Sequence, residues 1–315
     1  MHLSVVVPLF NEERNVPVLH EALTHALRGI GCTYEIVVVD DGSSDGTPQL
    51  LRALAQDDPH LRVIQFRRNY GQTAAMSAGF DHARGEYVVS MDGDLQNDPA
   101  DIPRLLALLE EGYDIVCGWR RHRKDAWLSR LLPSKLANFL IRRATRVPIH
   151  DTGCSLKAYR AWVVRSLDLY SDMHRFIAAL AAGLGARVAE IPVRHHPRRY
   201  GRSKYGLGRI FRVVADLLTI KMLIQFSAHP IRWFTLLALP LLLASPALLV
   251  IGTFRFDAGA IELASRFDTY YMTAAAVTTM VAVNVFLLGF LAELQIRASR
   301  FFARRISVAA KEAAQ

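Results

Sequence analysis

Uninterrupted apolar runs rich in β-branched residues alternate with helix-length segments through the first third of the chain. The runs cover residues 3–9, 35–39, 61–66 and 86–91, and the segments between and after them cover residues 15–28, 47–55, 72–84 and 99–110. Because the runs show no polar alternation, they predict parallel strands whose two faces are both covered by helices. The expected fold class is therefore α/β with a mostly parallel sheet.

Polar side chains follow three of these predicted strands at the point where each run ends. They are Asn11, Glu12, Asp40, Asp41, Asp92 and Asp94. In parallel sheets, ligands bind beyond the carboxyl ends of the strands. The pattern therefore predicts that these six side chains lie at one binding site.

Asp92 and Asp94 stand one residue apart directly after the fourth run. Mg²⁺ prefers oxygen ligands and usually takes one or two carboxylates plus water and substrate phosphates, so an open metal site is one interpretation. An acidic turn before a helix is the other, because Asp, Gly, Asn and Pro are also common in turns. The motif taken alone leaves both open.

Other nucleotide and metal motifs fail on inspection. No G-x-x-x-x-G-K-[ST] sequence occurs, and residues 29–31 lack the third glycine and the preceding strand of a dinucleotide-binding motif. Cys32, Cys117 and Cys154 have no disulfide or metal-ligand spacing, which is typical of a reducing compartment. We assign the cysteines no role.

Several motifs, in order along residues 1–294, resemble family 2 glycosyltransferases with the GT-A fold. They are VVVPLFNE at 5–12, VVDDGSSDG at 38–46, RNYGQ at 68–72, MDGDLQN at 91–97, DTGCSLK at 151–157 and GRSKY at 201–205. The last four resemble the polyprenyl-phosphate branch, which contains dolichyl-phosphate mannose synthase, undecaprenyl-phosphate glucosyltransferases and the aminoarabinose transferase of lipid A modification. The resemblance implies a Rossmann-like GT-A sheet, mostly parallel, with helices on both faces.

The resemblance also implies roles for individual residues. A divalent cation, Mg²⁺ or Mn²⁺, would be held by Asp92, Asp94 and Gln96. The nucleotide sugar would contact Pro8, Phe10, Glu12, Asp40, Asp41, Asp92 and Gln96, with Arg198 and Lys204 closing over its pyrophosphate. The acceptor phosphate would contact Arg120, Arg130 and Ser134, and the residues of catalytic importance would be Asp94, Arg130 and Asp151.

Alternatives remain for several of these residues. Packing at the strand end is the alternative for Pro8 and Phe10, and contact with water or lipid headgroups is the alternative for Arg120 and Arg130. Because a phosphate nucleophile needs no strong base, we expect Asp151 to orient the sugar or a phosphate-binding arginine.

Two stretches, residues 233–254 and 270–292, contain no charged residue. Each is long enough to cross a hydrocarbon core of ~30 Å, and core helices of soluble proteins rarely lack charge over this length. Residues 196–232 carry eight Lys or Arg against one acidic residue, and residues 293–315 carry five against two, whereas residues 255–269 carry two against three. The positive-inside rule therefore predicts two transmembrane helices with the α/β domain and both termini in the cytosol, as expected for the bacterial inner membrane.

The net charge of +9 is concentrated beside these spans. Residues 118–146 hold nine Lys or Arg and one Asp, interleaved with apolar residues, which is typical of a helix at an anionic membrane surface. Residues 207–226 predict a second interfacial helix. This placement argues against nucleic-acid binding. The predicted domains are 1–206, a cytosolic GT-A domain; 207–231, juxtamembrane; 232–294, two-span transmembrane; and 295–315, a basic cytosolic tail.

The expected function is transfer of a sugar, with inversion, from a UDP-linked donor to undecaprenyl phosphate, which would supply cell-envelope glycan or lipid A modification. A processive polysaccharide synthase is one alternative, although residues 229–233 (HPIRW) have His where such enzymes carry the Gln of Q-x-x-R-W. An inactive glycosyltransferase-like membrane scaffold is the other. The resemblance further implies a homo-oligomer, a tetramer in related enzymes.

Overall fold

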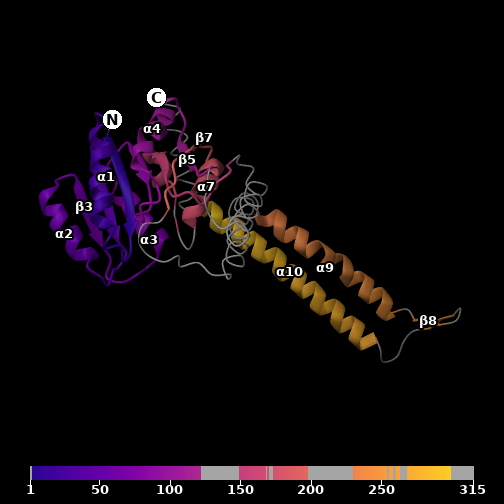
Figure 1. Cartoon of the computed structure of the whole chain (residues 1–315). Coiled ribbons are helices and arrows are strands. Elements are labelled where there is room, and N and C mark those ends of the chain that lie inside the picture. Colours follow the sequence, from indigo (N-terminus) through magenta and orange to yellow (C-terminus); the bar gives the residue numbers. More distant parts are fainter. Residues whose placement is uncertain are drawn as a thin grey trace. The chain divides into compact units, whose positions relative to one another are not determined.

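The computed structural model describes residues 2–121, 149–167, 169, 173–197, 230–253, 255–257, 260–262 and 268–298. The chain divides into two compact units, residues 1–220 and 221–315. The first contains the sheet and the second contains two long apolar helices (Figure 1). The boundary predicted after residue 206 lies outside the described residues.

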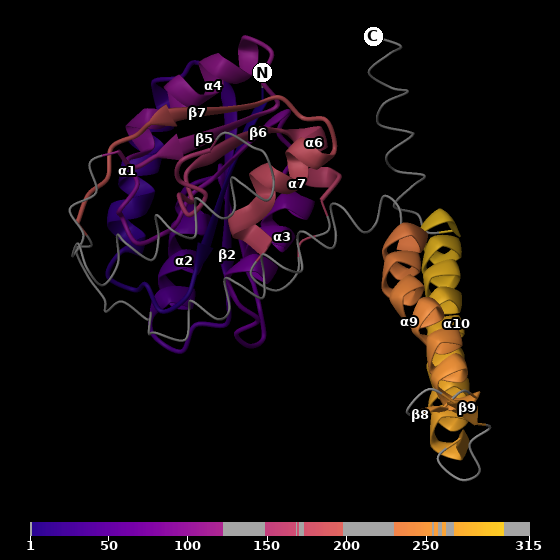
Figure 2. The same cartoon turned by 90° about the vertical axis from the view of Figure 1, so that its right-hand side faces the viewer.

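A seven-stranded sheet in the order β3-β2-β1-β4-β6-β5-β7 forms the centre of the first unit. Its strands β2, β5, β6 and β7 are labelled in Figure 2. The strands are β1 (His2–Leu9), β2 (Thr33–Asp40), β3 (Leu61–Gln65), β4 (Tyr87–Ser90), β5 (Ile115–Trp119), β6 (Lys157–Arg160) and β7 (Val188–Pro192). All neighbours are parallel except β6, which runs antiparallel to both β4 and β5. The mostly parallel sheet confirms the predicted fold class, and β1 to β4 match the four predicted strands.

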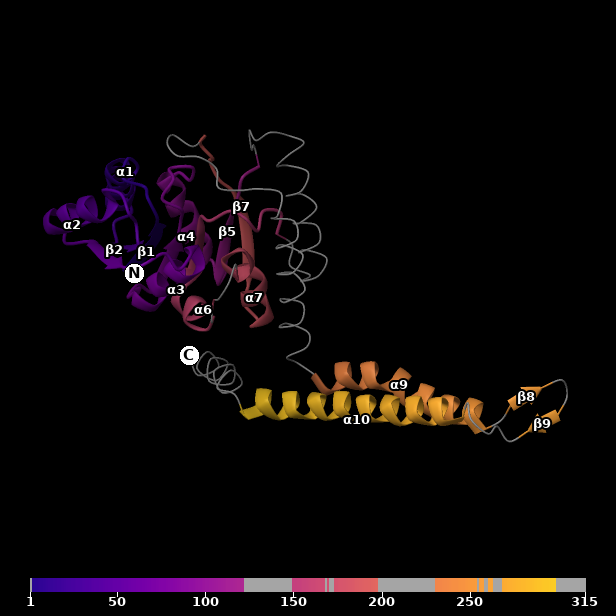
Figure 3. The ribbon, with the colours of Figure 1, turned by 90° about the horizontal axis from the view of Figure 1, so that it is seen from below.

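Helices cover both faces of this sheet (Figure 3). They are α1 (Val16–Arg28), α2 (Thr47–Asp57), α3 (Gln72–His82), α4 (Ile102–Glu110), α6 (Ala161–Arg165) and α7 (Ile177–Gly183), with 3-10 turns η1 (Pro99–Asp101) and η3 (Met173–Phe176). The sequence predicts α1, α2, α3 and the η1–α4 segment. It does not predict β5, β6, β7, α6 or α7.

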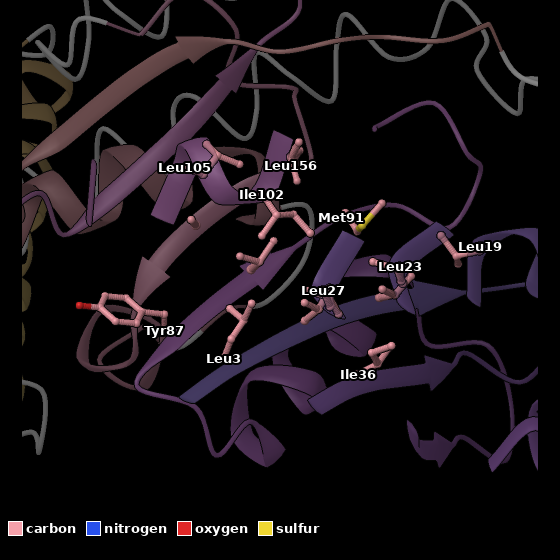
Figure 4. Packing of buried hydrophobic residues seen from close by; sticks show 14 of the residues in the cluster. Leu3, Leu19, Leu23, Leu27, Ile36, Tyr87, Met91, Ile102, Leu105 and Leu156 are labelled. Carbon is pink, nitrogen blue, oxygen red and sulfur yellow. The ribbon is translucent and has the colours of Figure 1, made fainter. Parts of the chain in front are cut away.

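Alternate residues of each strand pack into two separate hydrophobic layers. Val5 and Val7 of β1 face one layer with α1, α2 and α4, whereas Val6 faces the other with α3, α6 and α7. On α1, Leu19, Leu23 and Leu27 recur every four residues and form one buried stripe (Figure 4). Burial on both faces is the physical reason that the strands read as continuous apolar runs.

The second unit is an antiparallel helical pair. It contains α9 (Pro230–Thr253), β8 (Arg255–Asp257), β9 (Ala260–Glu262) and α10 (Asp268–Ala298). Both α9 and α10 are long and apolar enough to cross a membrane. Ala238 and Ser245 of α9 are buried in the pair, as are Ala275 and Ala282 of α10. Such small residues allow close approach of membrane helices.

Glu35 joins the neighbouring strands β1 and β2 near their amino ends. It stands in register with Ser4, whose hydroxyl donates to Glu35 at 2.6 Å, and it also accepts from Arg62 at 2.6 Å and from the Arg84 N–H at 2.7 Å. Burial alone would raise the pKa of Glu35, but these hydrogen bonds and the Arg62 charge outweigh it and lower the pKa.

We therefore expect Glu35→Gln to lower the free energy of unfolding of the sheet unit by about 1.5–3 kcal/mol at pH 7. Because the folded pKa is lowered, the wild-type advantage is full above the ordinary glutamate pKa of about 4.3 and disappears as the pH falls through the folded value. Denaturation of the full chain, followed by tryptophan fluorescence at pH 7 and pH 3, measures this. Glu86→Gln, at an exposed glutamate, is the control, and equal effects of the two substitutions would contradict the account.

Candidate active site

Two loops at the carboxyl ends of β1 and β2 are joined by side-chain-to-backbone hydrogen bonds. The Asn11 N–H donates to Ser43 Oγ at 2.8 Å, and Asn11 Oδ1 accepts from the Ser44 N–H at 2.8 Å. The Glu12 N–H donates to Thr47 Oγ1 at 3.0 Å. Ser43 and Thr47 therefore fix the first loop against the second.

Asp40 and Asp41 end β2 in different environments. Asp40 is fully buried, its Oδ1 accepts from the Ser43 N–H at 3.1 Å, and its Oδ2 has no hydrogen-bond partner within the described residues. Asp41 accepts from the Tyr70 N–H at 2.7 Å and the Gly71 N–H at 2.9 Å. Burial raises the pKa of Asp41 more than these two bonds lower it, and the Asp40 charge adds to the rise.

Pro8 lies inside β1 and Phe10 directly after it, both partly exposed. Val6 O accepts from the Met91 N–H at 3.2 Å, so Pro8, two residues farther along, faces the same side of β1, beyond the end of β4. The missing N–H of a proline is tolerated there. Nucleotide contact by Pro8 and Phe10 stays a prediction.

Asp92 follows β4 and is fixed by residues from two other elements. Its Oδ1 accepts from Gln72 Nε2 at 2.6 Å, at the start of α3. Its N–H donates to Ser155 Oγ at 3.3 Å, and the same Ser155 oxygen accepts from Asn97 Nδ2 at 2.7 Å. Ser155 therefore joins the acidic loop to the segment that precedes β6.

Asp94 is buried on the same loop, and its Oδ1 accepts from the Gln96 N–H at 3.2 Å. Leu95 between them has a left-handed backbone with φ of 61°. Gln96 O accepts from the His196 N–H at 2.9 Å, beyond the end of β7. The predicted metal ligands Asp92, Asp94 and Gln96 thus share one short, fixed loop.

The electrostatics of this loop favour a cation. Burial raises the pKa of Asp92 to about 6, and repulsion by the Asp94 carboxylate adds to the rise, while Ser155, Arg120 and Lys157 oppose it. Oxygen ligands of this kind fit Mg²⁺ or Mn²⁺. Within the described residues there is no group of three or more His, Cys, Asp or Glu that could hold a metal, so ligands from water or substrate would have to complete the coordination.

Arg120 and Asp151 form a nearly buried two-point ion pair beside the loop. Arg120 Nε donates to Asp151 Oδ2 at 2.7 Å, and Arg120 Nη2 donates to Asp151 Oδ1 at 2.9 Å. Asp151 raises the pKa of Arg120 although burial would lower it. Glu190 of β7 accepts from the N–H groups of His150 and Asp151, both at 2.9 Å, which fixes the Asp151 turn.

Lys157 begins β6 and is buried. Its Nζ donates to Thr152 O at 3.2 Å and lies 3.5 Å from His174 O in η3. His174 Nδ1 in turn lies 2.7 Å from Thr73 Oγ1 of α3. Lys157 therefore joins the Asp151 turn to η3, and its charge lowers the pKa of Asp92.

Four predicted site residues, Arg130, Ser134, Arg198 and Lys204, lie outside the described residues. Conversely, the structure adds residues that the sequence did not single out individually: Gln72, Asn97, Ser155, Lys157 and Glu190. The first four fall inside recognisable motifs, which is the signal that could have found them. Glu190 belongs to no motif.

Comparison with known proteins shows which family this chain belongs to. The model of "Glycosyl transferase family 2" matches residues 4–167, from within β1 to beyond β6, including the loops that carry Asp41 and Asp92. The chain belongs to glycosyl transferase family 2. A dodecaprenyl-phosphate galacturonate synthase of Rhizobium johnstonii is 42% identical over 94% of this chain and 88% of that protein. An undecaprenyl-phosphate 4-deoxy-4-formamido-L-arabinose transferase of Shewanella sediminis is 44% identical over 74% of this chain and 69% of that protein.

Solved structures confirm the fold expected of this family 2 glycosyltransferase. Glucosyl-3-phosphoglycerate synthase from Mycobacterium tuberculosis, in complex with Mn²⁺, UDP and glucosyl-3-phosphoglycerate, matches with a TM-score of 0.54 and 23% identity over 70% of this chain and 79% of that one. A complex of that enzyme with Mg²⁺ and UDP gives a TM-score of 0.53. The shared architecture is the GT-A fold.

The buried Arg120–Asp151 pair predicts a large effect of removing one charge. We expect Asp151→Asn to lower the free energy of unfolding by about 3–5 kcal/mol, because it leaves a nearly buried guanidinium without its anionic partner. Asp98→Asn is the matched control, since Asp98 pairs with Arg194 and His196, whose side chains are 56% and 52% exposed. Its loss should be about 1 kcal/mol or less. Equal losses in chemical denaturation would contradict the inferred burial of the pair.

Proposed function

We propose that this family 2 glycosyltransferase transfers the sugar of a UDP-linked donor to a polyprenyl phosphate at the bacterial inner membrane. The observation that carries the proposal is the pair Asp92 and Asp94, fixed on one loop near the nearly buried Arg120, in a chain with two helices long enough to span a membrane. Two relatives above 40% identity bear the names of polyprenyl-phosphate enzymes, which supports a lipid phosphate acceptor.

The donor nucleotide is proposed to lie over the ends of β1 and β2. Asp40 and Asp41 lie at the end of β2, and Glu12 follows β1 on a loop fixed by Thr47. The remaining lone pairs of Asp41 can accept hydrogen bonds from base or ribose. The unpartnered oxygen of Asp40 is fully buried, so contact of Asp40 with the nucleotide would require a local movement of the loop. Pro8 and Phe10 would supply apolar contact. Arg198 and Lys204 would close over the diphosphate.

A divalent cation is proposed to be held by Asp92, Asp94 and Gln96. Their oxygens suit Mg²⁺ and Mn²⁺. The pKa of Asp92 is raised first by burial and then by repulsion from the Asp94 carboxylate, and a bound cation would offset both. When bound, the cation would neutralise charge that develops on the leaving diphosphate.

The acceptor phosphate is proposed to be the nucleophile. A phosphate monoester has a second pKa near ~6, so its oxygen is largely ionised at neutral pH and needs no base. One of its oxygens forms the bond to the anomeric carbon while the bond to the nucleoside diphosphate breaks and the electron pair leaves with the diphosphate, which inverts the anomeric centre.

Arg120, Arg130 and Ser134 are proposed to hold this acceptor phosphate. Asp151 accepts from Nε and Nη2 of Arg120, and Nη1 makes no hydrogen bond within the described residues. The guanidinium therefore keeps donors for a phosphate. Asp151 acts as a positioning residue for Arg120 and not as a base.

The helices α9 and α10 are proposed to cross the inner membrane with the sheet unit and both termini in the cytosol, where nucleotide sugars are made. The support is the excess of Lys and Arg on both outer flanks over the connecting segment, residues 255–269. The product, a lipid-linked sugar in the inner leaflet, would serve cell-envelope glycan synthesis or lipid A modification.

A direct test is turnover by the purified full chain in phospholipid nanodiscs with undecaprenyl phosphate and a panel of radiolabelled UDP- and GDP-sugars. The proposal expects one labelled lipid-phosphate sugar, formed only with divalent cation and with inverted anomeric configuration. A polymeric product, or transfer to water alone across the whole panel, would contradict it.

Substitutions in the acidic loop separate the metal ligands from their neighbours. Asp92→Asn and Asp94→Asn are each expected to weaken Mn²⁺-dependent UDP binding, measured by calorimetry, roughly 100-fold or more. Asp98→Asn, on the same loop but paired with Arg194 and His196, should leave that binding within about 3-fold of wild type. Unchanged binding in Asp94→Asn at saturating Mn²⁺ would falsify the metal assignment.

The acceptor assignment predicts a selective kinetic effect. Arg120→Lys keeps the charge but loses the forked geometry, so the KM for polyprenyl phosphate should rise about 10-fold, while the KM for the nucleotide sugar stays the same. Arg104→Lys, at an exposed arginine paired with Asp101, is the matched control. A rise in the KM for the nucleotide sugar alone would contradict the assignment of Arg120 to the acceptor site.

A further inference from the structure

The segment that leads into α3 is bound to the end of β2. Asp41 accepts hydrogen bonds from the Tyr70 N–H at 2.7 Å and from the Gly71 N–H at 2.9 Å. Gly71, the residue before α3, has φ of 96° and ψ of 158°, a conformation that is essentially restricted to glycine. The turn presents two successive N–H groups to Asp41, and the helix begins at the next residue, Gln72.

The start of α3 is also fixed against the rest of the sheet unit. Thr73 is buried, and its Oγ1 lies 2.7 Å from Nδ1 of His174 in η3. Farther along α3, Gly79 lies so close to β1 that a Cβ atom there would come within 2.2 Å of the Val6 side chain. The first turns of α3 therefore have little freedom to move, and Gln72 shares this fixed position.

The partly buried side chain of Gln72 extends from this helix start to the acidic loop. Its Nε2 donates to Asp92 Oδ1 at 2.6 Å. An ionised carboxylate can only accept hydrogen bonds, so the amide presents its NH₂ group to Asp92. The Asp92 N–H is held separately by Ser155 Oγ. Because a carboxylate is planar, a fixed backbone and one fixed oxygen together determine where the second oxygen points.

The bond from Gln72 has a specific consequence for a loop that carries two carboxylates. Asp92 and Asp94 repel each other, and a freely rotating Asp92 side chain would relieve this repulsion by turning away. A hydrogen bond from a neutral amide opposes that rotation and adds no positive charge that would compete with a metal ion. Groups that orient metal ligands in this way typically change metal affinity about 10- to 100-fold when they are removed.

We propose that Gln72 is a positioning residue for the divalent cation: it holds the Asp92 carboxylate in the orientation in which that carboxylate binds the metal. The Gly71 turn, bound to Asp41, holds Gln72 in turn. One segment, residues 70–72, thereby links the carboxylate assigned to the nucleotide with a carboxylate assigned to the metal. The inference rests on the metal site of the proposed function and adds to it a residue that is not itself a ligand.

Gln72→Met tests the amide, because it keeps the length of the side chain and removes the donor. Mn²⁺ is titrated into the purified full chain with UDP, and electron paramagnetic resonance counts the protein-bound ion after subtraction of a protein-free UDP solution. The Kd for Mn²⁺ should rise about 10- to 100-fold. Gln65→Met is the matched control, since Gln65 is exposed on β3 and accepts from Arg52 at 2.7 Å, and it should leave this Kd unchanged.

Excess metal separates a turned ligand from a damaged fold. UDP binding to Gln72→Met, measured by calorimetry without divalent cation, should stay within about 2-fold of wild type. At saturating Mn²⁺ the UDP affinity should again lie within about 3-fold of wild type, because mass action fills the weakened site. A loop that had lost its structure would not recover in this way.

Gly71→Ala tests the turn that holds Gln72. An added Cβ meets no heavy atom within 4 Å beyond the chain neighbours, so the substitution strains only the backbone. We expect it to raise the Mn²⁺ Kd about 3- to 30-fold in the wild type. In the Gln72→Met background the further rise should be less than about 2-fold, because the turn acts through the amide that is already absent.

Each failure has a different signature. Wild-type Mn²⁺ binding in Gln72→Met, or an equal loss in Gln65→Met, would overturn the positioning role of Gln72. Fully additive losses from Gly71→Ala and Gln72→Met would overturn the link through the turn. If the wild-type chain itself binds no Mn²⁺ in the presence of UDP, the metal site of the proposed function is wrong, and the inference is overturned together with it.

Discussion

The burial of two neighbouring carboxylates on one loop, together with the repulsion between them, is the constraint on which the rest of this site depends. Asp92 and Asp94 are kept close although burial and mutual repulsion raise the pKa of Asp92. Such an arrangement is unfavourable in a protein unless a cation compensates it. Arg120 and Lys157 lie near enough to do so in part. In the proposed function, the remaining imbalance would favour a ligand that brings positive charge and further oxygen atoms.

The antiparallel strand β6 explains how residues from later in the chain contact the loop that carries Asp92 and Asp94. Because β6 runs against β4 and β5, the segment before it, with Asp151 and Ser155, lies at the same edge of the sheet as the end of β4. Ser155 then binds the acidic loop, and Asp151 holds Arg120 at the end of β5. One reversed strand thus combines a carboxylate loop and a cation into one site, and the family assignment gives that site its chemistry.

Sequence patterns predicted the parts of the protein that rest on local signals. The runs of β1 to β4 are apolar and rich in β-branched residues, and the two long C-terminal helices contain uncharged stretches of more than 20 residues. Both kinds of element were therefore evident from the sequence. Strand β6 was not predicted, because it has four residues and begins with the buried Lys157, which reads as polar. The positions of Asp92 and Asp94 followed from strand ends, whereas the bonds to Gln72 and Ser155 could not, because they link residues 20 and 63 positions apart. Such pairings depend on the sheet order and not on local preference.

The central claim is that the acidic loop is half of a metal site, completed by the diphosphate of the nucleotide. The most direct measurement is electron paramagnetic resonance of Mn²⁺ titrated into the purified full chain with and without UDP, including the hyperfine coupling to phosphorus. The account predicts weak Mn²⁺ binding to the protein alone, binding of one ion per chain at least 10-fold tighter with UDP present, and a resolved phosphorus coupling. Mn²⁺ binding that is indifferent to UDP, or a bound ion without phosphorus coupling, would contradict it.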